Sequence, residues 1–269
     1  MKKMTLYTGG AFCLLLLVMA FTGKKKNAAP GQRDVVKTKA VGNSSAPIKY
    51  IYLTFDDGPL EGSEHIDSVV LQERLKISVF LVGQLVMQNK KLQAYLEQYK
   101  TNPYIEAYNH SYTHAGGKYK KFYSQPVSVL DDIQHDEAVL GLHYKIVRLP
   151  GRNIWRIGKL RKDDVAVGNS GSAAADTLAA HGYKVFGWDT EWRHNSDGTP
   201  IQTVDEMVKE IETRLESGAT LTKDHIVVLI HDEMFRKTWE ESELKQLVDK
   251  LREHENYVFE HVRYYPYRD

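Results

Sequence analysis

Cysteine is almost absent from this sequence. Cys13 is the only cysteine in 269 residues, so an intramolecular disulfide is excluded, and with it a small scaffold held together by disulfides. Cys13 also lies inside an apolar run, whereas a lipid-attachment cysteine would follow such a run. The folded state must therefore rest on a hydrophobic core, which a chain with 42% hydrophobic residues can supply.

An excess of charge of one sign is missing as well. The chain has 36 Lys and Arg residues against 35 Asp and Glu residues. This balance does not indicate a strongly charged partner, so we expect no binding to nucleic acid. The 16 tyrosines and 4 tryptophans would suit flat ligands such as sugars, although aromatic residues fill cores more often than they line grooves.

A long apolar run is the third missing feature. The run Ala11–Phe21 is shorter than the roughly 20 residues that a membrane-spanning helix needs. Lys2 and Lys3 precede it and small or polar residues follow it, which is typical of a secretory signal peptide over residues 1–23. We therefore expect an exported protein (periplasmic, cell-envelope-associated or secreted) with no stable membrane span. An uncleaved N-terminal anchor over the same residues is the alternative.

Residues 24–47 have the composition of a flexible linker, and the folded domain is expected over residues 48–269. Within that domain, short β-prone runs alternate with helical patterns, and no internal repeat is found. The predicted strands are Lys49–Phe55, Ile77–Val82, Tyr104–Tyr108, Lys145–Leu149, Lys184–Gly187, Ile226–Ile230 and Tyr257–His261. The predicted helices are Ser63–Leu75, Gln84–Tyr99, Val127–Leu142, Ser172–His181, Thr203–Ser217 and Trp239–His254.

This alternation predicts a parallel sheet covered by helices, because parallel strands need long crossover connections. The pattern fits either a (β/α) barrel or a doubly wound sheet. In both architectures a functional site forms at the carboxyl ends of the strands. Acids, histidines or an arginine lie at the ends of several predicted strands, where scattered surface charge would not be expected to collect.

Two histidines follow the third predicted strand. His110 and His114 lie four residues apart, so in a helical turn they share one face and could hold one metal ion. A carboxylate from elsewhere would complete a three-ligand site that leaves a position for water, as a hydrolytic metal needs. The alternative is a pair of surface histidines on a loop.

Two acids end the first predicted strand. Neighbouring residues on a strand point to opposite sides, so Asp56 and Asp57 are not expected to bind the same ion. At a strand end they could instead flank one cavity, one as a metal ligand and the other as a base that takes a proton from water. The alternative is a capped turn, since Gly58-Pro59 follows and all these residue types favour turns.

Three further polar residues lie at strand ends. His231 follows an apolar run and could donate a proton to a leaving group, although a histidine bonded to backbone is the alternative. Asp189 could hold that imidazole and favour its charged form, and Arg148 could keep the catalytic carboxylate ionised. Each of these interpretations depends on the position that the three residues share, at the ends of predicted strands.

Five short segments, taken in order, resemble the polysaccharide deacetylases of carbohydrate esterase family four. The resemblance covers about Tyr50 to Asp232 and implies a distorted (β/α) barrel of about seven parallel strands. It also implies one divalent metal ion, usually zinc, with Co²⁺, Ni²⁺ or Mn²⁺ as alternatives. The five segments are Thr54–Pro59, His110–His114, Arg148–Pro150, Asp189–Trp192 and Leu229–His231.

The resemblance also implies a role for each residue of the site. Three residues would be the metal ligands, and the others would be the base, the acid, their positioning partners, an oxyanion donor and the walls of the acetyl pocket. In that order they are Asp57, His110 and His114 as ligands, Asp56 as base, His231 as acid, Arg148 positioning Asp56, Asp189 tuning His231, the backbone N–H of Gly151 as oxyanion donor, and Trp192 with Leu229 as the pocket walls.

Two of the segments depart from the family pattern. The third usually has an aromatic residue after the proline, whereas this chain has Gly151 and Arg152, so another residue such as Trp155 would have to supply that wall. The fourth is one residue shorter than usual, which affects the placement of Trp192 and, to a lesser degree, of Asp189.

The predicted function is metal-dependent removal of N- or O-linked acetyl groups from an acetylated polysaccharide or oligosaccharide, such as peptidoglycan, chitin-like chains or xylan. Two alternatives remain at this stage. One is a carbohydrate-binding envelope protein that keeps the fold without turnover, and the other is a metal-dependent amidase acting on a smaller amide.

Overall fold

The computed structural model of the chain describes residues 46–166 and 170–267. The predicted signal peptide and nearly all of the predicted linker lie outside the described residues. Across those two described stretches, no helix is long and apolar enough to cross a membrane.

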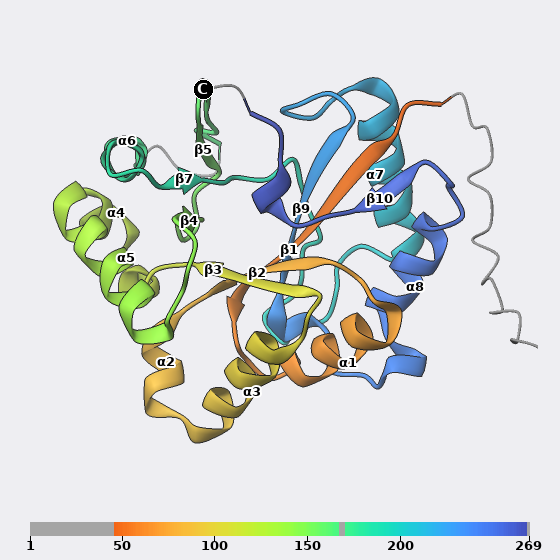
Figure 1. The fold of residues 1–269 in the computed structure, drawn as a ribbon, viewed down its shortest axis with the longest axis horizontal. Helices are drawn as coiled ribbons and strands as arrows, with labels where there is room; N and C mark the ends of the chain where they lie inside the picture. The colour runs from red at the N-terminus through yellow and green to blue at the C-terminus, as the bar shows by residue number, and fades with distance from the viewer. Residues whose placement is uncertain (1–45, 167–169, 268–269) are drawn as a thin grey trace, which may run out of the picture. The chain divides into compact units, whose positions relative to one another are not determined.

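The domain is built on one sheet, mixed in strand direction and flanked by helices (Figure 1). The strand order is β6-β5-β7-β4-β3-β2-β1-β9-β8, and β10 pairs with the first residues of β1. Among the named strands of the described residues, only β5 pairs in the antiparallel sense, with β6 and β7. The strands are β1 (Lys49–Gly58), β2 (Ile77–Leu81), β3 (Ile105–Asn109), β4 (Ile146–Val147), β5 (Ile154–Ile157), β6 (Leu160–Asp163), β7 (Lys184–Val185), β8 (Thr190–Glu191), β9 (His225–His231) and β10 (Tyr257–Phe259).

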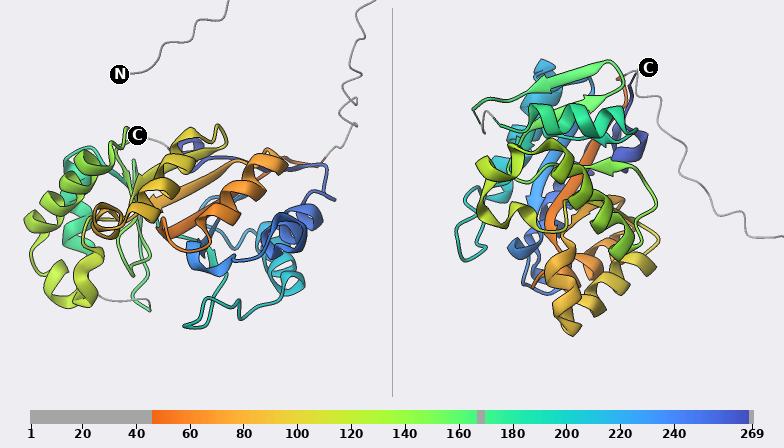
Figure 2. Two further views of the ribbon diagram at one scale, coloured as in Figure 1. Left: turned by 90° about the horizontal axis from the view of Figure 1, so that it is seen from below. Right: turned by 90° about the vertical axis from the view of Figure 1, so that its left-hand side faces the viewer.

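Helices of very different length connect these strands, and two further views of them are given in Figure 2. The α-helices are α1 (Ser63–Glu73), α2 (Gly83–Gln88), α3 (Lys90–Thr101), α4 (Tyr119–Tyr123), α5 (Pro126–Leu140), α6 (Ser172–Ala180), α7 (Val204–Ser217) and α8 (Glu243–Leu251). Short 3₁₀ turns are η1 (His114–Gly117), η2 (Asp232–Met234), η3 (Trp239–Glu241) and η4 (Val262–Tyr264).

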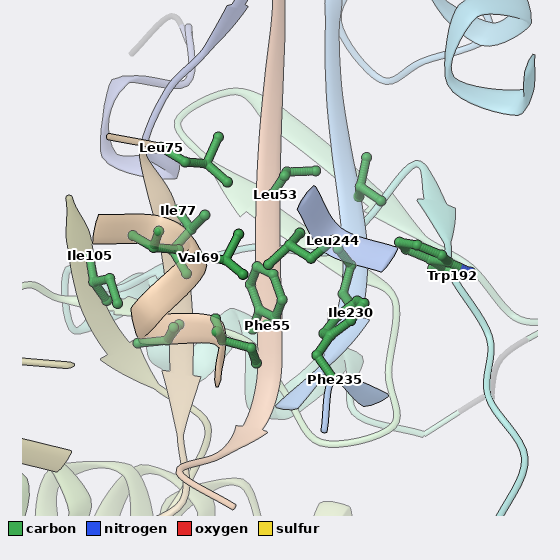
Figure 3. Close-up of a cluster of buried hydrophobic side chains, with 14 of the residues drawn as sticks. Leu53, Phe55, Val69, Leu75, Ile77, Ile105, Trp192, Ile230, Phe235 and Leu244 are labelled. Carbon is green, nitrogen blue, oxygen red and sulfur yellow. The ribbon is translucent and has the colours of Figure 1, made fainter. Parts of the chain in front are cut away.

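Strand β1 is buried on both faces, which explains its nearly continuous apolar sequence. Leu53 and Phe55 pack toward α1 and α8 in the largest core cluster, part of which is drawn in Figure 3. Tyr52 points to the opposite face, into a second cluster with Phe80 and Leu229. Because strand residues alternate between faces, Thr54 and Asp56 lie on the same side as Tyr52.

Each predicted strand has a counterpart in the sheet, and the predicted fold class is confirmed. The structure adds the hairpin of β5 and β6, which turns at Gly158, and the short strand β8. The helix predicted over Gln84–Tyr99 is two helices, because Asn89 has an extended backbone and its side chain caps α3 by accepting from the N–H groups of Lys91 and Leu92.

Candidate metal-dependent active site

The predicted site residues of β1 and β9 meet at the carboxyl ends of these two neighbouring strands. Asp56 and His231 are register partners in the parallel pair of β1 and β9. Register partners on adjacent strands are about 5 Å apart and point to the same side of a sheet. The proposed base and the proposed acid therefore emerge side by side.

The next residue of β1 turns away from Asp56. Asp57 has a φ of 69°, a left-handed backbone conformation that non-glycine residues seldom adopt. Ser111, His114 and Ala115 also have positive φ, at 71°, 47° and 57°. Strained backbone of this kind gathers at functional sites, where the surrounding structure holds it in place.

Three donor atoms converge at this turn. Asp57 Oδ1 lies 3.3 Å from Nε2 of His110 and 3.0 Å from Nε2 of His114. All three atoms lie within 4.8 Å of one another, and Oδ1 is buried without a hydrogen-bond donor among the described residues. An orphaned carboxylate oxygen facing two imidazole nitrogens fits a divalent cation, and the donor set of two histidines and one aspartate suits zinc or a similar ion.

The ring of His110 is fixed in the orientation that metal binding requires. Its Nδ1 lies 2.9 Å from the backbone carbonyl of Arg148, which can only accept a hydrogen bond. Nδ1 therefore carries the proton, and Nε2 is the nitrogen that can lose its proton and bind a metal.

The loop that carries the two histidines is tied to α5. Asn109 donates from its side chain to the carbonyl of Ile133 and accepts from the N–H of Ser111. The hydroxyl of Ser111 in turn accepts from the N–H of His114 at 3.0 Å. These bonds position both imidazoles from groups that do not themselves bind the metal.

Burial and charge act against each other in this cluster. Burial alone would raise the pKa of Asp57, but the neighbouring His110 and His114 outweigh it and hold that pKa well below its usual range. Burial alone would lower the pKa of His110, yet the carboxylates of Asp56 and Asp57 raise it overall. A metal ion would compete with a proton for His110, so metal binding should release a proton.

Asp56 is held by a buried arginine. Nη1 of Arg148 donates to Asp56 Oδ1 and to Thr54 Oγ1, both at 2.8 Å, and Nη2 donates to the carbonyl of Gly187 at 2.9 Å. Arg148 is 0% exposed and its guanidinium lies 4.4 Å from the centre of the Phe80 ring. Burial lowers the pKa of Arg148, while Asp56 acts in the opposite direction. The second carboxylate oxygen of Asp56 faces the donor cluster, 3.6 Å from Nε2 of His110.

His231 has a neighbour that the sequence did not suggest. Its ring lies 4.8 Å from the ring of His194, which is 3.4 Å from a carboxylate oxygen of Glu233. Nδ1 of His231 is buried and has no hydrogen-bond partner within the described parts of the chain. No short-range signal identifies His194, because it lies in the loop after β8 and reaches the site through the fold.

The structure does not bring Asp189 to His231. Its carboxylate accepts from the backbone N–H groups of Leu221 and Val227, at 2.7 and 2.8 Å. Val227 precedes His231 by four residues on β9, which is about 13 Å of extended strand. The expected contact is therefore corrected: Asp189 stabilises the opposite end of β9. Glu191, in register with Leu229, is the acid of β8 closer to the site.

The predicted pocket walls lie in different clusters. Leu229 belongs to the cluster of Tyr52 and Phe80, whereas Trp192 is fully buried in the largest core beside Phe235 (Figure 3). The indole N–H of Trp192 donates to the carbonyl of Gln202 at 2.8 Å. The arrangement does not support one acetyl pocket lined by both residues. Trp188 shares the cluster of Leu229.

Gly151 lies at an exposed turn, and its neighbour across the surface is Tyr119. The glycine has a φ of 59°, and a Cβ added to it would lie 3.3 Å from Tyr119 Cε1. Trp155, the sequence-based candidate for the missing aromatic wall, is instead fully buried with Phe186. The aromatic residue beside Gly151 is instead Tyr119, whose ring centre is 6.1 Å from that of His114.

Comparison with known families agrees with this geometry. Residues 43–155 match the family model described as polysaccharide deacetylase. The predicted family is confirmed. The prediction of a hydrolase of the polysaccharide deacetylase type is confirmed with it at the level of the family. The matched segment contains the proposed ligands, Asp56 and Arg148, but ends within β5, before His231. No curated protein matches the sequence at a significant level.

Solved polysaccharide deacetylases and related esterases share the fold. The catalytic domain of peptidoglycan N-acetylglucosamine deacetylase from Eubacterium rectale is 19% identical with a TM-score of 0.58, over 81% of this chain and 92% of that one. A family 4 carbohydrate esterase from Streptococcus mutans is 22% identical with a TM-score of 0.55, over 78% and 84%. One from Streptomyces lividans, solved with acetate, is 20% identical with a TM-score of 0.54, over 81% and 94%.

Proposed function

We propose that this protein removes acetyl groups from an acetylated polysaccharide by metal-assisted hydrolysis. The observation that carries the proposal is the convergence of Asp57, His110 and His114 beside Asp56, which is itself in register with His231. A donor set for a cation, a carboxylate held by a buried arginine and a histidine on the adjacent strand are the groups that hydrolysis of an amide or ester needs.

Asp56 acts as the general base. Its contact with Arg148 occupies Oδ1, so that Oδ2, on the side of the donor cluster, takes the proton from the attacking water. A divalent ion held by Asp57, His110 and His114 would polarise the acetyl carbonyl and make water easier to deprotonate. In this proposal the backbone N–H of Gly151, beside Tyr119, donates to the developing oxyanion.

His231 acts as the general acid. When the bond between water oxygen and acetyl carbon has formed, the bond from that carbon to the sugar nitrogen or oxygen breaks. His231 then gives its proton to the leaving amine or alcohol, and acetate is the other product. Its register with Asp56 puts the donor and the acceptor of protons next to each other on adjacent strands.

The substrate class and the place of action belong to the same proposal. The structural relatives include proteins named for peptidoglycan N-acetylglucosamine and for a xylanase, which supports a polymeric acetylated glycan. The basic and apolar N-terminal segment supports an exported, periplasmic or envelope-associated protein. Zinc is the proposed ion, because imidazole and carboxylate ligands suit it.

Acetate release tests this function. The full chain with zinc or cobalt should release acetate from an acetylated oligosaccharide, and Asp56→Asn should abolish release while metal content by elemental analysis stays at one ion. Full activity of Asp56→Asn would show that Asp56 is not the base.

The arrangement around His231 favours a second candidate, a carbohydrate-binding protein without turnover. The acid has no carboxylate partner at the position expected from Asp189. A protein that binds the metal and an acetylated glycan, but releases no acetate from N- or O-acetylated substrates, would establish this second function. Release from small amides but not from glycans would indicate an amidase.

A further inference from the structure

A basic pocket adjoins the metal site. It has a volume of about 800 Å³ and follows η1 along the chain, at the turn into α4. Its lining consists of Gly117, Lys118, Tyr119, Lys120, Lys121, Ser124 and Arg152. The lining therefore includes four cationic side chains and no acid.

Tyr119 is the wall that the pocket shares with the metal site. Its ring makes an edge contact with the ligand His114, at 6.1 Å between ring centres, and it covers the Gly151 turn. Tyr119 therefore belongs both to the surroundings of the metal site and to the lining of the pocket.

Arg152 supplies a fixed positive charge. Its guanidinium donates to the backbone carbonyl and hydroxyl of Ser170 and to the carbonyl of Gly151, and it has no carboxylate partner in the described part of the chain. It also lies over the rings of Tyr119 and Tyr123, at 5.3 and 4.9 Å from their centres. The guanidinium thus stays in one orientation while its charge is not neutralised by an acid.

The three lysines are also unneutralised. Lys118, Lys120 and Lys121 are exposed, and none of them forms an ion pair with an acid in residues 46–166 or 170–267. The chain as a whole carries a net charge of only +1, so this concentration of positive charge is local. A positively charged concavity raises the local concentration of anions.

We propose that this pocket binds a carboxylate group of the glycan whose acetyl group reaches the metal site, so that acidic acetylated polysaccharides are the preferred substrates. The inference rests on the proposed function. A sugar carboxylate can come from the lactyl group of muramic acid or from a uronic acid, and both present the same planar anion to lysine and to the field of Arg152.

The test compares three acetylated oligosaccharides of equal length: a neutral chain of N-acetylglucosamine, a glycan that contains N-acetylmuramic acid, and an acetylated oligouronate. Acetate release at low salt should show kcat/KM higher by roughly tenfold for one or both acidic chains, mainly through KM, because several partly exposed charge pairs act together. The preference should shrink at high salt, where the screening length falls from about 10 Å at 0.1 M to about 3 Å at 1 M.

Charge reversal locates the effect. Lys118→Glu/Lys121→Glu should remove the preference for acidic chains and leave kcat on the neutral chain unchanged. The matched control is Lys209→Glu/Lys223→Glu, which changes the net charge equally at two exposed lysines outside the pocket lining and should keep the preference. An equal rate on neutral and acidic chains, or equal effects of the two double variants, would overturn the proposal.

Binding separates this inference from the proposed function. If acetate is released from none of the oligosaccharides, the proposed function fails. Calorimetric binding of the same oligosaccharides still tests whether the pocket binds a carboxylate. Tighter binding of acidic chains that is lost only in Lys118→Glu/Lys121→Glu supports it, and equal binding overturns it. Binding to anionic phospholipid vesicles in preference to acidic glycans, lost in the same variant, would assign the lysines to a membrane surface instead.

Discussion

The two halves of the site differ in how completely their polar groups are held. In the metal–base half, formed by β1, β3 and the Arg148 turn after β4, the proposed ligand His110 and the proposed base Asp56 each have a fixed, buried partner. In the acid half, formed by β8, β9 and the loops after them, Nδ1 of His231 has no partner among the described residues. In the proposed reaction the first half must hold a cation in one geometry, whereas the acid only has to come within hydrogen-bond distance of the leaving group. The difference is therefore compatible with the proposed function.

The largest expected effect separates metal binding from proton donation. His110→Ala should lose both the bound zinc and all acetate release, because two ligands on a strained loop cannot replace three. His231→Ala should keep the zinc and lose activity by roughly 10²- to 10⁴-fold, the usual contribution of a positioned acid. Elemental analysis and acetate release on the same samples check both statements. Loss of zinc in His231→Ala would mean that the halves are not separate.

The second effect concerns stability. Arg148→Met should lower the free energy of unfolding by about 3–5 kcal/mol, because it leaves the buried charge of Asp56 uncompensated. Arg156→Met is the matched control, since Arg156 pairs with Asp163 and Asp176, which are 34% and 50% exposed. Loss of its ion pairs should cost about 1 kcal/mol or less, and the packing lost with the side chain adds a cost that both variants share. Denaturant unfolding compares them, and equal losses would contradict the special role of the Arg148–Asp56 pair.

The metal–base half was also the more predictable one. His110 and His114 come from one short segment, and Asp56 and Asp57 from another, so local spacing marked them as candidates and the resemblance to the family gave each its expected role. The contact of Arg148 with Asp56 followed from two strand ends on one sheet edge. The family match covers these same residues and stops before β8.

The positions of the residues in the acid half depend on the register of β8 against β9, which the spacing of residues in the sequence does not reveal. The Asp189–Trp192 segment is one residue shorter than the family pattern, and a shift of one residue on a strand moves a side chain to the other face. Trp192 therefore packs in the core, and Asp189 faces the amide groups at the far end of β9. Likewise, His194 and Tyr119 come from loops whose course the sequence did not predict.

The third effect is a pH dependence of stability in the acid half. Asp232 is buried next to His231, accepts from Ser63 and Tyr99, and burial raises its pKa to about 7. Between the ordinary pKa near 4 and that value, the folded protein holds a proton that the unfolded chain has released. The free energy of unfolding should therefore fall as pH rises through this window, by a few kcal/mol at most.

Asp232→Asn isolates this contribution. The amide keeps an oxygen that can accept from Ser63 and Tyr99 but has no proton to lose, so the profile between pH 4 and pH 7 should flatten. Chemical unfolding at several pH values measures it. An unchanged slope would show that Asp232 is not the group responsible.

The smallest effect decides which acid, if any, acts on His231. Asp189→Asn should cost about 1–2 kcal/mol of stability, because one of the two bonds from Leu221 and Val227 loses its acceptor. It should leave the pH profile of kcat unchanged, because Val227, whose N–H the carboxylate accepts from, lies about 13 Å along β9 from His231. Glu191→Gln removes the same charge from β8, which begins directly after Asp189. Glu191 is in register with Leu229, two residues before His231, so this substitution should move the profile. A profile that moves with Asp189→Asn and not with Glu191→Gln would restore the pairing of Asp189 with His231 that the family pattern implies. It would also mean that the polar groups of the acid half are as fully hydrogen-bonded as those of the metal–base half.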